Sequence, residues 1–110
     1  MGERVQFFEA NVDMAKAFRQ FQKADKAFWK DKDGSAEKHL ERGLELLKKV
    51  ADHLVQGTED VYNNASKEVG KGNDELQKSI DSFDDDNDDR AEKHYQKALD
   101  HYDKALDMIS

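Results

Sequence analysis

The sequence predicts an all-α protein, and within that class an up-down-up-down four-helix bundle made of two similar helical hairpins. Three observations favour this class. The 110 residues include no proline and no cysteine, and Ala, Leu, Lys, Glu, Gln and Asp are abundant, a composition that permits long helices. Apolar residues recur at steps of three and four, as on the buried face of a helix. A nine-residue stretch is also repeated in altered form half a chain later.

The repeat joins residues 36–44 to residues 91–99, and 91 minus 36 gives an offset of 55, which is half of the chain. We interpret the chain as one domain, residues 1–110, in which hairpins 1–55 and 56–110 arose by internal duplication. A chain of this length supports one modest core rather than two independent domains. Two hairpins that dimerise instead of closing on each other are the structural alternative.

The first hairpin is expected to have helices over residues 4–31 and 35–56. The inner seam of its first helix alternates bulky residues with alanine, a pattern typical of a bundle core: Phe7, Ala10, Met14, Ala17, Phe21, Ala24 and Phe28. The second helix has a broader apolar face, which suits a globular bundle: Ala36, Leu40, Gly43, Leu44, Leu47, Val50, Ala51 and Leu54.

In the second hairpin, the third helix is expected to be capped by Thr58, the turn to lie at residues 84–89, and the last helix to run over residues 89–109. The offset of 55 carries the first seam onto residues of similar size: Tyr62, Ala65, Val69, Gly72, Leu76, Ser79 and Phe83. Residues 70–73 contain two glycines, which cost roughly 2 kcal/mol relative to alanine in a helix. A kink or local break is therefore an open alternative at that point.

Charge and composition narrow the function classes. The net charge is −7; the first 55 residues carry eleven Lys and Arg against ten Asp and Glu, and the last 55 carry seven against fifteen. This acidic excess disfavours binding to nucleic acid or to anionic lipid.

Without cysteine there is no disulfide or thiolate site, and the N-terminal residues contain no apolar run that would indicate a leader or a membrane span. We expect a cytoplasmic protein with no cofactor and, since no nucleophile, base or metal constellation can be recognised, no enzymatic activity.

Matching residues across the turns predicts the core layers. Phe28, Leu40, Phe83 and Tyr95 are expected to share one layer, and Phe21, Leu47, Leu76 and Tyr102 another. Between them lies a layer of four small residues, Ala24, Gly43, Ser79 and Ala98. This small-residue layer either packs closely or leaves a void. A void would make the protein a carrier of a small apolar ligand, bound by Ala24, Gly43, Ser79, Ala98, Tyr95 and Tyr102.

Two further patterns bear on metal binding. The turn at residues 84–89 has acidic residues at alternate positions, as the calcium-binding loop of an EF-hand does. The twelfth position of such a loop would be Tyr95, where an EF-hand has a bidentate glutamate. Weak divalent cation binding by Asp84, Asp86 and Asp88 is therefore a second alternative function. The histidines are expected to be structural or solvent-facing, since none follows a glutamate at the spacing that di-iron bundles use: His39, His53, His94 and His101.

The two hairpins differ most on the outside of their first helices. The first helix has extra apolar residues off its main seam: Val5, Phe8, Val12, Ala15, Phe18 and Trp29. Their equivalents at the offset of 55 are polar, charged or glycine: Asp60, Asn63, Lys67, Gly70, Asn73 and Asp84. An apolar patch with a polar rim marks an interface, unless the first helix is simply more buried than the third. We therefore expect a small non-enzymatic interaction protein whose first helix binds a second copy, forming a homodimer, or a partner helix through Val5, Phe8, Val12 and Phe18.

Overall fold

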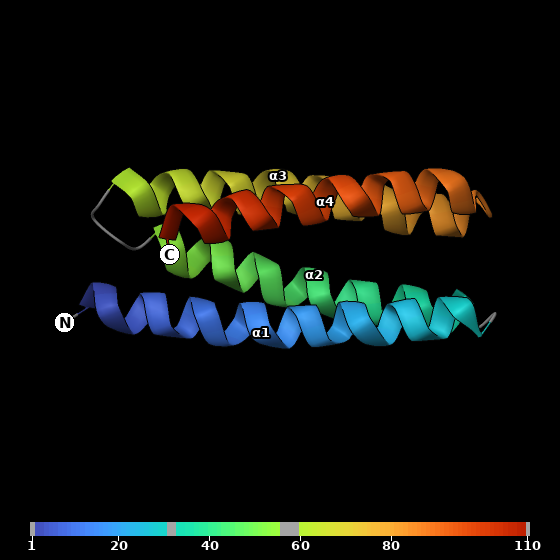
Figure 1. The fold of residues 1–110 in the computed structure, drawn as a ribbon, viewed down its shortest axis with the longest axis horizontal. Helices are drawn as coiled ribbons and strands as arrows, with labels where there is room; N and C mark the ends of the chain where they lie inside the picture. The colour runs from blue at the N-terminus through green and yellow to red at the C-terminus, as the bar shows by residue number, and fades with distance from the viewer. Residues whose placement is uncertain (1, 31–32, 56–59, 110) are drawn as a thin grey trace.

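The computed structural model describes residues 2–30, 33–55 and 60–109, with side chains for residues 12–30, 34–55 and 60–109. Four helices make up this structure: α1 (Gly2–Trp29), α2 (Asp33–Val55), α3 (Asp60–Asp84) and α4 (Asp88–Ile109). The chain reverses direction at each connection, so consecutive helices are antiparallel (Figure 1). The predicted all-α, up-down-up-down bundle is confirmed; its Cα atoms extend over 45 × 19 × 18 Å. No described helix combines the length and the apolar character that a membrane span needs.

The helix bounds agree closely with those expected from capping and periodicity. Helix α1 begins at Gly2 rather than residue 4, α2 at Asp33 rather than residue 35, and α4 at Asp88 rather than residue 89. The ends expected at residues 31 and 56, and the cap expected at Thr58, lie outside the described residues. Helix α3 continues through residues 70–73, so its two glycines do not break it.

The core is the shared interior of all four helices. Each helix contributes residues of the apolar face that its periodicity predicted, together with Ile80, and the side chains of the central cluster are at most 4% exposed. The cluster comprises Met14, Ala17, Phe21, Ala24, Leu40, Leu44, Leu47, Val50, Leu54, Ala65, Val69, Leu76, Ile80, Ala98, Tyr102 and Ala105. Because residues from both hairpins enter this one cluster, neither hairpin buries its apolar face without the other.

The side of the bundle between α1 and α4 is wider than the others. The pairs α1/α2, α2/α3 and α3/α4 pack with close backbones, whereas no Cα atom of α1 lies within 8 Å of one in α4 among the described residues. Aromatic rings fill this space. The Phe21 ring lies 5.7 Å from that of Tyr95, edge to face, and 6.1 Å from that of Tyr102, stacked at 12°.

Two glycines allow these rings to reach the centre of the bundle. A Cβ atom on Gly43 of α2 would lie 2.5 Å from Cε1 of Phe21, and one on Gly72 of α3 would overlap the ring of Tyr102. Each stacked ring therefore rests directly on the backbone of the neighbouring helix in its own hairpin. Close backbones within each hairpin and large rings between α1 and α4 together produce the uneven bundle.

The two hairpins make one matching polar contact. His39 donates from Nδ1 to Oε1 of Gln20 at 2.8 Å, and His94 donates from Nδ1 to Oε2 of Glu75 at 2.6 Å. In both cases the histidine lies nineteen residues after its partner. This agreement supports two similar hairpins, and their origin by duplication stays a prediction.

Candidate functional site

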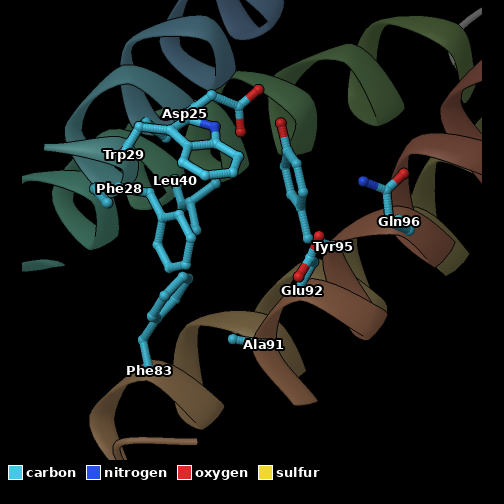
Figure 2. Close-up of a pocket in the computed structure, with 11 residues that line it drawn as sticks. Asp25, Phe28, Trp29, Leu40, Phe83, Ala91, Glu92, Tyr95 and Gln96 are labelled. Atoms are coloured by element: carbon cyan, nitrogen blue, oxygen red, sulfur yellow. The ribbon is translucent and has the colours of Figure 1, made fainter. Parts of the chain in front are cut away.

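A half-open pocket lies between α1 and α4, toward the α3–α4 turn. It has a volume of about 80 Å³, and Figure 2 shows that side chains from both helices face into it. Helices α2 and α3 supply its floor. The lining residues are Ala24, Asp25, Phe28, Trp29, Ala36, Leu40, Phe83, Ala91, Glu92, Tyr95 and Gln96.

The pocket lies where the sequence predicted an aromatic core layer. Phe28, Leu40, Phe83 and Tyr95 all line it, so this predicted layer is confirmed. The rings of Phe28 and Phe83 meet at 6.0 Å with an angle of 62°, and Figure 2 shows them next to each other on the side opposite Tyr95. The layer is not fully closed, because α1 and α4 lie apart and the small side chains of Ala36 and Ala91 leave space between the rings.

Trp29 stands at the edge of this pocket and is 83% exposed. The preceding residue, Phe28, occupies the inward position of α1, so the next side chain is directed away from the core. The two rings meet edge to face at 6.1 Å and 80°. Tryptophan is a residue type enriched among the anchors of protein interfaces.

Two carboxyl groups stand on opposite walls of the pocket, Asp25 on α1 and Glu92 on α4. Partial burial, and then the negative charge of Glu92, raise the pKa of Asp25 above its ordinary value. Burial, followed by the charge of Asp25, also raises the pKa of the Tyr95 hydroxyl, so this group stays protonated at neutral pH. In Figure 2 that hydroxyl points toward the side of the pocket where Asp25 lies.

The residues expected to bind a small ligand are only partly brought together here. Ala24 and Tyr95 line the pocket, whereas Gly43 lies against the Phe21 ring, and Ala98 and Tyr102 are fully buried. Ser79 is buried as well, and its hydroxyl donates to the backbone oxygen of Ala91 at 2.6 Å. The Tyr102 hydroxyl donates to Oδ1 of Asn73 at 2.8 Å. The small-residue layer is therefore filled by rings, and its polar groups are used inside the protein.

The residues expected to bind a partner lie along α1. The side chains of Val5 and Phe8 are outside the described residues. Val12 is 37% exposed, and Phe18 is half-buried against the core with its ring 6.1 Å from that of Phe21. Phe18 is eleven residues before Trp29, about three helical turns, so the two lie on the same face of α1.

The acids expected to bind a cation lie in and beside the α3–α4 turn, where the structure gives some of them other roles. Asp86 adopts a left-handed φ of 56°. The amide of Asn87 donates to the Ser82 oxygen at 2.8 Å and that of Asp86 to the Phe83 oxygen at 3.0 Å, which together form a Schellman end to α3. Asp84 and Asp88 are the last residue of α3 and the first of α4. Within the described ranges, no group of three His, Asp or Glu side chains is arranged to hold a metal ion.

One acid of α2 has an unusual environment near this turn. Glu37 shares a hydrogen bond with Asp84, and this bond, partial burial and the charges of Asp84, Glu41 and Asp81 raise its pKa to about 7. The pair joins α2 to the end of α3. No spacing rule in the sequence pairs these two residues, since they are brought together only when the hairpins pack.

The four histidines connect the helices of each hairpin. Besides the bonds of His39 and His94, the Nδ1 of His101 lies 2.9 Å from Oε2 of Glu68, and the Nε2 of His53 lies 3.8 Å from Oδ2 of Asp13. These hydrogen bonds hold the pKa of Glu68 and of Glu75 below the ordinary value for glutamate. The sequence predicted a structural or solvent-facing role and missed the partners. Two pairs of these partners are equivalent at the offset of 55: Gln20 with Glu75, and Asp13 with Glu68.

The fold and the pocket define the class of this protein, which is a short antiparallel four-helix bundle with an aromatic pocket rimmed by acids. No family model, curated protein or solved structure matches the chain.

Proposed function

We propose that this protein is a non-enzymatic interaction module whose α1–α4 pocket accepts a side chain of a partner protein. The observation that carries the proposal is the 83% exposure of Trp29 at the mouth of an apolar pocket. Exposed tryptophans next to pockets are frequent anchors of protein interfaces, because they bury much area at little conformational cost. A cytoplasmic location is part of the same proposal.

The size of the pocket favours a protein side chain over a free small ligand. Pockets for drug-sized molecules have volumes of roughly 300–1,000 Å³, and this one has about 80 Å³. A single side chain fits such a space, while the rest of the partner can lie along the outer faces of α1 and α4. Carriage of a small apolar ligand in the core has less support, since rings occupy the small-residue layer.

One of the α1 residues expected from the sequence to bind a partner, Phe18, lies in line with the pocket. Phe18, Asp25 and Trp29 are spaced at seven and four residues, so they form a stripe along one face of α1. A partner helix that inserts a side chain into the pocket would run along this stripe. Val12 lies on a different face, and it is the residue to test for contact with a second copy.

Selection of random twelve-residue peptides on the immobilised protein tests the proposal. We expect peptides that shift the fluorescence of Trp29, the single tryptophan of the chain, and that bind Trp29→Ala at least about tenfold more weakly, or about 1.4 kcal/mol. Met108→Ala is the matched control, since Met108 is also exposed (39%) but lies on α4 away from the pocket.

The proposal is contradicted if no peptide is enriched, or if the enriched peptides bind Trp29→Ala as tightly as the wild type. Sedimentation velocity of the wild type and of Val12→Glu separates the homodimer from a different partner. A wild-type dimer that Val12→Glu dissociates would assign the apolar α1 surface to self-association.

A further inference from the structure

The chemistry of the pocket walls indicates which side chain it accepts. The aromatic rings of Phe28, Trp29 and Tyr95 supply apolar faces, and the carboxyl groups of Asp25 and Glu92 stand on opposite helices. None of the described residues that line the pocket is Lys, Arg or His. An apolar side chain would fill the floor and leave both acids facing each other without a cation.

We propose that the pocket binds an arginine side chain of a partner polypeptide, with the guanidinium between Asp25 and Glu92 and against the aromatic rings. This inference rests on the proposed function and specifies the partner for the same site. The planar guanidinium stacks on aromatic faces and offers five donors, which suits two carboxylates on opposite sides better than the compact ammonium of lysine does.

Three observations favour this occupant. A cation between the two carboxyl groups would relieve the repulsion that Glu92 exerts on Asp25. The Tyr95 ring lies between α1 and α4 with its hydroxyl toward Asp25 (Figure 2), so an aromatic face stands next to this carboxylate. The net charge of −7 also attracts a basic segment over a longer range.

Matched peptides test the arginine directly. The probes are acetylated and amidated Ala-Arg-Ala, the same peptide with citrulline, which has the shape of arginine without its charge, and the same peptide with norleucine. Binding is measured from the Trp29 indole resonance in two-dimensional NMR and from Trp29 fluorescence. We expect the arginine peptide to bind about tenfold more tightly than the citrulline peptide, since charged hydrogen bonds are the stronger ones.

Charge variants show whether the two named acids are responsible. The double variant Asp25→Asn, Glu92→Gln is expected to bind the arginine and citrulline peptides equally. The control Asp100→Asn, Asp103→Asn changes the net charge by the same amount at exposed positions of α4 outside the pocket, and it should keep the preference. A preference that persists in the pocket variant, or that disappears in the control, would overturn the inference because it would reflect general charge attraction.

The results also separate this inference from the proposed function. If arginine, citrulline and norleucine peptides all shift Trp29 with equal affinity, the pocket accepts side chains without a requirement for charge, and only the arginine assignment is wrong. If none of the three shifts Trp29 at millimolar concentration, the arginine assignment is also wrong, whereas the proposed function is judged by the peptide selection described above.

Discussion

Gly72 lies in the middle of α3, where a glycine normally weakens a helix, yet its missing side chain makes room for Tyr102. The Tyr102 ring is fully buried and stacked on Phe21, and its hydroxyl is bonded to Asn73. The ring is thereby held on both sides and cannot move to admit a methyl group. Gly70, two residues earlier in the same helix, has open space where a Cβ atom would be.

These two glycines predict opposite effects of the same substitution. We expect Gly70→Ala to stabilise the protein by up to about 1 kcal/mol, because alanine is the better helix former. Gly72→Ala should destabilise it by about 1–3 kcal/mol, because the overpacked core outweighs that gain. Urea unfolding of both variants checks this, and a Gly72→Ala protein as stable as Gly70→Ala would contradict the packing described here.

Glu37 predicts how stability depends on pH. Its pKa is about 7 in the folded protein and near the ordinary 4.5 when unfolded, so the folded state binds the extra proton. The stabilisation from this group is present below the unfolded pKa and is lost as the pH rises through about 7. We expect Glu37→Gln, which stays neutral, to lose less stability than the wild type between about pH 5 and about pH 8.

Urea unfolding at the two pH values measures this difference. The control is Glu45→Gln, which removes the same charge from an exposed site of α2 near Lys48. It should keep the pH dependence of the wild type. Equal pH dependence in Glu37→Gln and in the wild type would show that the Glu37 and Asp84 pair does not hold the extra proton.

The α3–α4 connection shows how an acidic stretch can serve an element boundary. Asp86 takes the left-handed conformation that a Schellman end requires, and the side chain of Asn87 caps α4 by accepting from the Arg90 amide at 3.2 Å. The acids that resemble a calcium loop thus lie at the end of one helix and the start of the next.

Replacing Asp86 tests this role. Asp86→Gly should stabilise the protein by about 0.5–1 kcal/mol, since glycine adopts the left-handed conformation without steric cost. Asp86→Asn removes the same negative charge and keeps a Cβ atom, so it separates the backbone effect from the charge effect. Thermal unfolding of both proteins gives the comparison; a glycine variant no more stable than the asparagine variant would argue against backbone strain at this position.

The whole molecule depends on contact between the two hairpins. Leu44 and Leu47 of α2 and Val69 and Leu76 of α3 are at most 4% exposed, and they lie in the one core cluster. We expect residues 1–57 and residues 58–110, prepared separately, to be partly helical without a cooperative thermal transition, because short helices are marginal without tertiary packing. Circular dichroism melts of each half and of their mixture check this. Cooperative melting of either half alone would mean that the chain has two folding units.

Several features could be predicted from the chain because they depend on local pattern. The helix positions, the seam of each helix and the layer of Phe28, Leu40, Phe83 and Tyr95 follow from apolar periodicity and from turns of known length. The extra apolar residues of α1 also led us to expect a binding surface on that helix, which stays a prediction. The pocket was not predicted at the layer of Phe28, Leu40, Phe83 and Tyr95, since the sequence offered a void only at the small-residue layer, as the alternative to close packing there.

The helical pattern and the pairing of helices were already specified by the order of residues, because periodicity and short connections act between near neighbours. The three-dimensional packing decided where the bundle opens. The Phe21 and Tyr102 rings rest on Gly43 and Gly72, stack between α1 and α4, and keep those two backbones apart. Asp25 and Glu92 face one pocket only as a result of that packing, because residues so distant in the chain meet only after all four helices have closed on one core.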